Sequence, residues 1–345
     1  MLNRLPEVTI AVIGDFFLDR YLVIESSLAE RSVETGLTAH QVIAKRLTPG
    51  AAGTVVSNLK ALGVGEVVCF GVIGADGEGY ELRKALRRIG AATRYALIES
   101  RERFTPCYTK PMLRENGVER ELERIDIKNR EPVPDSVESE LLQRLSSILH
   151  KIDGVIIADQ VRERNCGVVS DRVREALSRF SATTPGKVFL ADSRARIGEF
   201  KSVMTKPNAY EAVDAIMGEA RVDSLTGKVR RFGLSEAKLC GAKLWERTLA
   251  PVFMTAQEEG IFLFHSVCEH VPALRAKGEI DPVGAGDSCT AGIVSALCAG
   301  ASLEDAALVG NIVASITVQK IGETGTATPA EVLARFDEFN AGRGP

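Results

Sequence analysis

The seven residues Asp281-Pro282-Val283-Gly284-Ala285-Gly286-Asp287 (DPVGAGD) are the most informative part of this chain. They follow a strand-rich region and open an apolar helix that we predict at 285–299. Two glycines permit unusual backbone angles and a close approach of the main chain to a ligand. The free N–H groups in the first turn of a helix, together with the helix dipole, favour an anion. The stretch therefore predicts an anion site built from the main chain of Gly284, Ala285 and Gly286.

The carboxylate of Asp287 lies at the mouth of this predicted site, where it would repel the anion unless it had another task. A general base that takes the proton of an attacking hydroxyl is such a task, while the amides hold the charge that develops on a phosphoryl group. The alternative is structural, because an acidic residue in the first turn complements the helix dipole. The chain has no G-x-x-x-x-G-K-[ST] motif and no G-x-G-x-x-G after its first predicted strand. This excludes a P-loop enzyme and disfavours a dinucleotide-binding fold.

The bulk composition is that of an ordinary globular protein. The chain has 345 residues, of which 45% are hydrophobic and 26% charged, and its formal net charge is -3. This balance gives no basic footprint for nucleic acid. The seven cysteines form no C-x-x-C pair, as is typical of reduced thiols in the cytosol. Because we find neither a signal peptide nor a membrane span, we expect a cytoplasmic protein that binds neither nucleic acid nor membrane.

Helix and strand patterns alternate along most of the chain. The predicted strands lie at 9–13, 67–72, 155–158, 188–191, 202–205, 251–255 and 261–264. The predicted helices lie at 53–62, 78–89, 136–149, 169–180, 209–217, 285–299, 303–321 and 329–340. Such alternation is typical of a parallel sheet with helices on both faces. We therefore predict a three-layer α/β/α fold with a mostly parallel central sheet.

Two segments depart from this alternation, at about 16–47 and about 93–127. The first is polar and weakly periodic, and the second has alternating residues on both sides of Glu115-Asn116-Gly117, which predicts a hairpin. We interpret both as excursions that form a small β lid on one domain spanning 1–345. Exposed strand edges tend to pair. A homodimer through the lid strands is therefore predicted.

Five motifs, in order along nearly the whole chain, resemble those of the ribokinase-like carbohydrate kinases, the phosphofructokinase-B (PfkB) family. DPVGAGD resembles the family's D-T-x-G-A-G-D signature, which implies Asp287 as the base and 284–286 as the anion hole. The segment 14–19, GDFFLD, resembles the start of the sugar site and places the family's substrate-binding Asp at Asp19, with Asp15 as a second candidate. The segment 49–54, PGAAGT, stands where the family has P-G-G-A-A-N. This adds three candidate sugar-binding residues, Gly50, Ala51 and Thr54.

The same resemblance implies ATP and Mg²⁺ as cofactors. The segment 206–211, KPNAYE, matches P-N-x-x-E, so that Asn208 and Glu211 would organise Mg²⁺ and the phosphates. Thr255 and Gly260 correspond to the nucleotide-binding T-x-G-x-x-G element. We add Asn311 to the ATP-binding set. Asp281 is a candidate ligand for a monovalent cation such as K⁺.

Within the family, the chain is most similar to the heptose 7-phosphate kinases, the kinase half of ADP-heptose synthases. The start G-D-x-x-L-D-R-Y is present at 14–21, and Arg103-Phe104-Thr105 with Lys110 resembles R-P-T-x-x-K. Arg103 and Lys110 are candidates for a substrate phosphate, and Arg194 for a phosphate of the substrate or of ATP. The chain stops soon after 325–328, GTAT, so we expect no nucleotidyltransferase domain to follow.

Departures from the family pattern concentrate in the sugar pocket. Ala51 replaces a Gly and Thr54 an Asn, Gln257 replaces the middle Gly of the nucleotide element, and Arg194 ends a D-S-R in place of D-P-K. The segment 159–163, DQVRE, replaces D-Y-x-K-G. We therefore expect ATP-dependent phosphorylation of a hydroxyl on a sugar or sugar phosphate, which need not be a heptose phosphate. A nucleoside kinase of the same fold and a non-catalytic sugar or nucleotide sensor stay open as alternatives.

Overall fold

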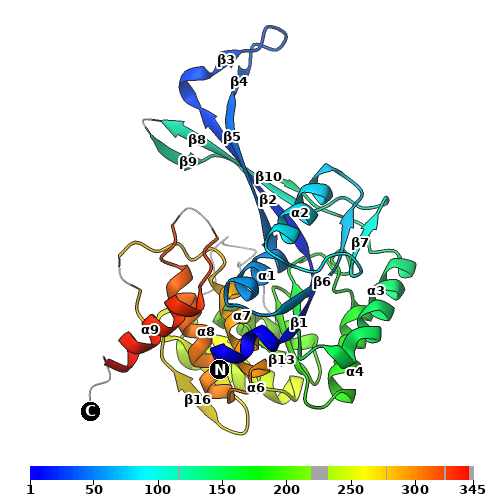
Figure 1. Cartoon of the computed structure of the whole chain (residues 1–345), viewed down its shortest axis with the longest axis vertical. Helices are drawn as coiled ribbons and strands as arrows, with labels where there is room; N and C mark the ends of the chain where they lie inside the picture. Colours follow the sequence, from blue (N-terminus) through cyan, green and yellow to red (C-terminus); the bar gives the residue numbers. More distant parts are fainter. Residues whose placement is uncertain (116, 219–231, 277, 322–323, 342–345) are drawn as a thin grey trace.

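The computed structural model describes residues 1–345 except 116, 219–231, 277, 322–323 and 342–345. Its central sheet has the strand order β16-β15-β14-β13-β12-β11-β1-β6-β7 (Figure 1). The strands are β1 Thr9–Gly14, β6 Glu66–Gly74, β7 Leu97–Ser100, β11 Gly154–Asp159, β12 Val188–Ser193, β13 Met204–Thr205, β14 Val252–Thr255, β15 Ile261–Phe264 and β16 Cys268–Val271. Neighbouring strands are parallel from β7 to β14, and β15 is antiparallel to both of its neighbours. The prediction of a mostly parallel sheet is confirmed.

Helices cover both faces of this sheet, because alternate side chains of a strand point to opposite faces. Along β1, Ile10 and Val12 pack into one apolar cluster, whereas Ala11 and Ile13 pack into another. The helices of the first cluster are α1 Ala52–Ala61, α2 Gly77–Arg88, α7 Ala285–Cys298, α8 Leu303–Thr317 and α9 Pro329–Ala341. Those of the second are α3 Asp135–Ile148, α4 Asp171–Thr183, α5 Ala209–Met217 and α6 Leu234–Thr248. The predicted three-layer architecture is therefore confirmed.

A second sheet projects from the body as a lid (Figure 1). Its strand order is β10-β8-β2-β5, with β9 paired to β8, and a small ribbon of β3 and β4 lies at its tip. The bounds are β2 Phe16–Glu25, β3 Glu30–Arg31, β4 Thr38–Ala39, β5 Val42–Ala51, β8 Cys107–Glu115, β9 Val118–Glu121 and β10 Ile125–Ile127. Only Asp15 separates β1 from β2, so one nearly continuous stretch of chain leaves the core sheet and enters the lid.

The place of β7 and two unpredicted elements differ from the sequence prediction, whereas the predicted hairpin is confirmed. β7 falls in the second predicted excursion, yet it pairs with β6 in the central sheet, and the lid part of that segment starts at Cys107. Helix α6 and strand β16 were not predicted. The β8–β9 hairpin is present, with Glu115 opposite Val118, whereas Asn116 of its turn lies outside the described residues. Among the described residues, no helix is long and apolar enough to span a membrane.

Candidate active site

The predicted anion site lies at the start of α7. Gly284 precedes the helix with φ 79°, a left-handed conformation that favours glycine. The N–H of Ala285 donates to the carbonyl of Pro282 at 3.2 Å, so that amide is already engaged in a turn. The N–H groups of Gly286 and Asp287 have no hydrogen-bond partner in the described part of the chain. The N–H of Gly284 has no partner there either, so Gly284 and Gly286 of the predicted set keep free donors, Ala285 does not, and Asp287 adds one.

Several charged side chains converge on the carboxyl group of Asp287. Burial and the nearby carboxylate of Asp192 raise the pKa of Asp287 to about 7, while Lys206 and Arg194 act in the opposite direction. Asp19, the predicted sugar ligand, also contributes to the raised pKa of Asp287, so the two carboxylates are close enough to interact electrostatically. A carboxylate with a pKa close to neutrality is suited to accept a proton during catalysis.

Lys206 and Asp192 form a buried ion pair beside this centre. Lys206 Nζ lies 3.0 Å from Asp192 Oδ2, and the two side chains are 3% and 11% exposed. Thr290 Oγ1 also donates to Asp192 Oδ2, at 3.3 Å. A Cβ built on Gly286 would lie 3.6 Å from Lys206 Nζ, so the ammonium group lies next to the anion site. The sequence analysis missed this pair, although its two residues stand in the KPN and DSR segments that it singled out.

The predicted sugar-binding turn contacts both Asp19 and the anion site. A Cβ on Gly50 would lie 2.6 Å from Asp19 Oδ2, so only glycine leaves room for that carboxylate. Ala51 has φ 53° and ψ −119°, a conformation that is unfavourable for any residue except glycine. Thr54 Cγ2 lies 3.4 Å from the position of a Cβ on Gly284. The structure thus brings together Asp19, the turn and the start of α7.

Asp15 is placed differently from what we expected of a sugar ligand. Its Oδ2 accepts hydrogen bonds from the N–H groups of Gln160 at 2.8 Å and Val161 at 3.1 Å. Its Oδ1 accepts one from Val168 at 2.7 Å. Burial and the nearby Asp159 raise the pKa of Asp15 to about 6, although these hydrogen bonds act to lower it. The carboxylate therefore holds the loop that follows β11, and both of its oxygens already serve the main chain.

Arg103 and Lys110 also have protein partners. Arg103 donates from Nη1 to the carbonyl of Glu131 at 2.8 Å and from Nη2 to that of Cys166 at 2.5 Å. Lys110 Nζ donates to the hydroxyl of Tyr21 at 3.1 Å. The spacing R-P-T-x-x-K puts its lysine five residues after Arg103, at Tyr108, whereas Lys110 is two residues further along β8. Lys110 was therefore wrongly matched to that motif, and Tyr108 occupies the position.

Asn208 and Glu211 form a capping box at the start of α5. Glu211 N–H donates to Asn208 Oδ1 at 2.9 Å, and Asn208 N–H donates to Glu211 Oε2 at 2.8 Å. The same turn is tied to β14 because Thr255 N–H donates to the carbonyl of Pro207 at 2.9 Å. Burial and Asp192 raise the pKa of Glu211 to about 7, while Lys206 opposes the rise. Two of the predicted nucleotide residues, Asn208 and Thr255, are therefore neighbours in space.

This donor set fits a Mg²⁺ ion that is shared with phosphates. Glu211 Oε1 has no hydrogen-bond partner in the described structure, so one carboxylate oxygen can face an ion or its water shell. No group of three or more His, Cys, Asp or Glu side chains among the described residues could hold a metal by itself. Mg²⁺ commonly takes one or two carboxylates and completes its shell with waters and substrate phosphates.

The remaining predicted residues shape loops near the site. Gly260 has φ 91°, and a Cβ there would lie 2.4 Å from the carbonyl oxygen of Val271. Asn311 Nδ2 donates to that same carbonyl oxygen at 2.9 Å, so the amide of Asn311 supports this loop. Gln257 stands at the family's middle glycine and keeps a positive φ of 51°. Asp281 Oδ1 accepts the N–H of Val283 at 3.0 Å, and Oδ2 has no partner in the described structure.

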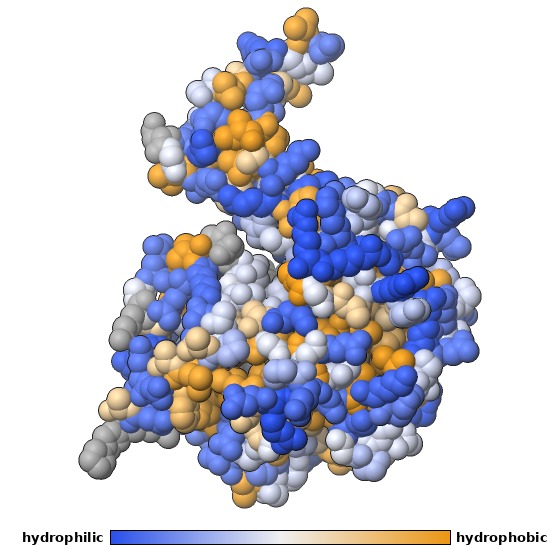
Figure 2. Space-filling view, in the orientation of Figure 1, coloured by the Kyte–Doolittle hydropathy of each residue, from blue (hydrophilic) through white to orange (hydrophobic). Residues whose placement is uncertain are grey.

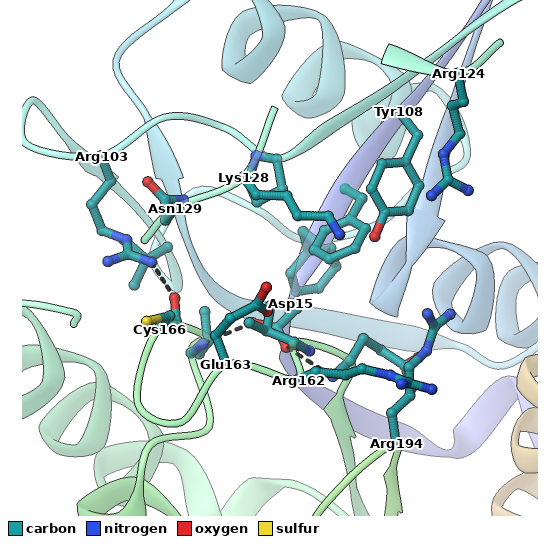
Figure 3. Close-up of a pocket in the computed structure, with 17 residues that line it drawn as sticks. Asp15, Arg103, Tyr108, Arg124, Lys128, Asn129, Arg162, Glu163, Cys166 and Arg194 are labelled. Atoms are coloured by element: carbon teal, nitrogen blue, oxygen red, sulfur yellow. Dashed lines mark hydrogen bonds between the residues drawn. The ribbon is translucent and has the colours of Figure 1, made fainter. Parts of the chain in front are cut away.

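A cavity of about 140 Å³ opens between the lid and the loop after β11 (Figure 3). Its charged and aromatic lining residues are Asp15, Phe16, Phe17, Arg103, Tyr108, Arg124, Lys128, Arg162, Glu163 and Arg194. Asp19, Lys110 and Asp287 do not line it. Figure 3 shows Arg162 and Arg194 together on one side of the cavity, with Tyr108 and Arg124 on the lid side. Arg194 thus connects the cavity with the centre around Asp287, whose pKa it affects.

The fold and this site define a class of sugar kinase. The structure resembles "Structure of Arabidopsis thaliana Ribokinase complexed with Ribose and ATP" with a TM-score of 0.66 and 17% identity over 95% of this chain and 98% of that one. It resembles phosphofructokinase-2 from Escherichia coli with a TM-score of 0.65 and 15% identity, over 96% of this chain and 99% of that one. Likenesses at this level of identity show the shared fold. The ribokinase-like fold is therefore confirmed.

The family follows from the sequence match. The model of the pfkB family carbohydrate kinases matches residues 9–330, and the chain belongs to that family. The Bifunctional protein HldE of Pelobacter propionicus is 30% identical over 340 residues, which are 96% of this chain and 64% of that relative. The Bifunctional protein HldE of Trichlorobacter lovleyi is 28% identical over 343 residues, which are 97% of this chain and 64% of that relative. The chain thus spans somewhat less than two thirds of the length of these relatives.

Proposed function

We propose that this carbohydrate kinase transfers the terminal phosphoryl group of ATP to a hydroxyl of a sugar phosphate, with Asp287 as the general base. One observation carries the proposal. A carboxyl group with a pKa near 7 lies at a helix start with free N–H donors, and Arg194, which lowers that pKa, lines a cavity together with other cations. The relatives named HldE and the neighbours described as ribokinase and phosphofructokinase-2 support an acceptor of this kind.

The chemistry assigned to the chain is proton removal and charge stabilisation. The ionised Asp287 takes the proton of the acceptor hydroxyl as the oxygen forms a bond to the terminal phosphorus of ATP. The bond between that phosphorus and the oxygen shared with ADP breaks, and ADP leaves with the electron pair. The free amides of Gly286 and Asp287 donate to the phosphoryl oxygens, where charge has to be stabilised. Asp19 and the Gly50–Thr54 turn hold the sugar so that one hydroxyl faces the base.

Mg²⁺ would be held beside Asn208 and Glu211, through the Glu211 oxygen that has no protein partner. When bound, the ion neutralises charge on the phosphates of ATP. The residues of the chain orient this site, because the capping box fixes Glu211 relative to Asn208. We keep Thr255 and the Gly260 loop as the candidate nucleotide contacts. Asp281, through its free oxygen, stays the candidate ligand of a monovalent cation such as K⁺.

The cavity supports a phosphorylated acceptor over a neutral one. The guanidinium of Arg162 has no hydrogen-bond or ion-pair partner among the described residues. The terminal nitrogens of Arg194 have none there either, whereas its Nε donates to Oε1 of Gln160 at 2.7 Å. Arg124 lies 4.3 Å from the centre of the Tyr108 ring. Guanidinium groups bind phosphate well because their donors form a fork. A phosphate in the cavity would leave the sugar ring to extend past Tyr108 toward Asp19.

A panel of acceptors tests the proposal. ADP release from MgATP is measured with ribose, a hexose 6-phosphate, a heptose 7-phosphate and a nucleoside, and we expect the phosphorylated sugars to be preferred. Arg162→Met should raise the KM of the best acceptor about tenfold or more while leaving the KM of ATP nearly unchanged. Arg164→Met is the matched control, because Arg164 is paired with Asp171 and Glu199 outside the cavity. Preference for a neutral sugar or a nucleoside would contradict the proposed substrate class.

The base is tested separately. Asp287→Asn removes the proton acceptor with little change in shape, so kcat should fall on the order of a hundred- to ten-thousandfold while MgATP binding is kept. Calorimetric titration with MgATP checks the second part. Turnover close to that of the unmodified protein would remove Asp287 from its role.

A homodimer through the lid is part of the proposal. Apolar side chains are exposed along the lid, including Val33 at 98%, Leu37 at 70% and Leu28 at 50% (Figure 2). Exposed apolar surface of this kind is typical of an interface. Light scattering at micromolar concentration should give twice the 37.2 kDa mass of one chain. Val33→Asp should weaken the association, and a monomer in the unmodified protein would contradict it.

A further inference from the structure

We infer that Lys206 is a catalytic residue of this kinase: its ammonium group contacts the phosphoryl group in transfer from the side of the anion site that faces the sheet. This inference rests on the proposed function, because it assumes that the start of α7 holds the terminal phosphate of ATP. It concerns a residue outside the lid, the cavity and the pair Asn208 and Glu211.

The geometry places a fixed cation next to the free amides. Lys206 follows β13 at the end of the sheet where α7 begins, and its N–H donates to the carbonyl of Ala191 at 2.9 Å. That bond fixes the backbone from which the side chain starts. The side chain is only 3% exposed, and its Nζ lies 3.6 Å from the position of a Cβ on Gly286. Gly286 has no side chain, so only open space separates this ammonium group from an anion held by the helix start.

The hydrogen bonds of Lys206 are incomplete without a ligand. An ammonium group has three donors. Asp192 takes one of them, at 3.0 Å, and no other acceptor for Nζ is present among the described residues. The two remaining donors are thus buried without a protein partner, next to donors of the main chain that also lack one. A group of convergent, unsatisfied donors is what an anionic ligand requires.

The role follows from where charge develops. As the acceptor oxygen bonds to the terminal phosphorus and the bond to ADP breaks, negative charge is spread over the phosphoryl oxygens while Asp287 holds the proton. A buried cation at that point stabilises this charge more strongly than one in water would, because the local dielectric is low. Asp192 holds the ammonium group in place through their contact of 3.0 Å.

A purely structural role makes a different prediction. In that case Lys206 does no more than neutralise the buried Asp192, and removal of both charges together should restore activity. The discriminating variant is therefore Lys206→Met combined with Asp192→Asn, compared with Asp192→Asn alone. The pair of variants also covers the case in which Lys206→Met by itself leaves Asp192 unpaired and does not fold.

The experiment measures kcat and KM for MgATP with the best acceptor of the panel. We expect the double variant to be about a hundred- to a thousandfold slower in kcat than Asp192→Asn, as is usual for loss of one donor to the developing charge. Lys206→Arg, which keeps the charge, should be faster than Lys206→Met. Lys201→Met, at an exposed cation away from the site, should equal the unmodified protein.

Two outcomes separate this inference from the function on which it rests. Equal rates for Asp192→Asn and the double variant would overturn the role of Lys206, provided that Asp287→Asn has lost transfer. Retained transfer in Asp287→Asn would instead overturn the proposed function, whatever the Lys206 variants do.

Discussion

Replacement of Ala51 by glycine should stabilise the protein, although the same change at most positions destabilises it. Ala51 connects lid strand β5 to helix α1 and has φ 53° and ψ −119°. A non-glycine residue in such a region carries about 1–3 kcal/mol of strain. Glycine relieves this strain, while its extra freedom in the unfolded chain costs roughly 0.5–1 kcal/mol. Loss of a partly buried methyl group costs up to about 0.8 kcal/mol more.

The expected net gain is therefore about 1 kcal/mol in the free energy of unfolding. Unfolding entropy of about 2.1 cal/mol/K per residue gives roughly 0.7 kcal/mol/K for a chain of 345 residues, so Tm should rise by about 1–2 °C. Urea unfolding with a fitted slope is the better assay, because it reports the free energy directly.

Ala44→Gly is the matched control for this prediction. Ala44 lies in the same strand, is exposed, and is not among the residues with positive φ. That substitution should lower the free energy of unfolding by roughly 0.5–1 kcal/mol. If Ala51→Gly destabilised the protein as much as Ala44→Gly does, the backbone at Ala51 would not be strained and the argument would fail.

Three further predictions concern the charged centre. In its proposed role Asp287 is a base only when ionised, and burial raises its pKa to about 7, so kcat/KM should rise with pH up to about 7 and level off above it; a rate that is flat from pH 5 to 8 would contradict this. The pKa of Asp287 is raised in the folded protein, so its ionisation removes stability as pH rises from about 4 to about 7, and Asp287→Asn should raise Tm at pH 8 but not at pH 4. An equal shift at both pH values would show that the carboxylate is not destabilised by folding. Glu211→Gln keeps an oxygen for the capping box but loses the charge, and should raise the Mg²⁺ concentration for half-maximal activity several-fold; an unchanged Mg²⁺ requirement would remove Glu211 from the metal site.

Most strands of the central sheet could be predicted because regularly alternating helices and strands give a clear pattern in the sequence. Helix α6 was missed although Ala237, Cys240, Gly241 and Leu244 recur at helical spacing and are buried, since charged residues between them hide the pattern. β7 was assigned to the lid excursion because a strand of four residues, Leu97–Ser100, has no readable period. Its partner β6 is the preceding strand of the chain, on the other side of α2, and only the fold shows that pairing.

The main-chain conformation of the candidate site could be predicted from its motifs. The hydrogen-bond partners of its side chains could be predicted less well. Gly284 and Gly260 have the positive φ values that the motifs imply. By contrast, the partners of Asp15 and Arg103 are main-chain groups far away in the sequence. Asp15 accepts from the N–H of Gln160, and Arg103 donates to the carbonyl of Cys166. Which donor reaches which carbonyl depends on packing. The sequence could therefore name these residues but not the direction in which they point.

The direct passage from β1 into β2 has a mechanical consequence. Asp19 lies in lid strand β2, whereas Asp287 lies in helix α7, which packs against the central sheet. A movement of the lid relative to the body would therefore change the separation of these two carboxylates, so that under the proposed function a sugar bound by Asp19 would reach Asp287 in one position of the lid alone.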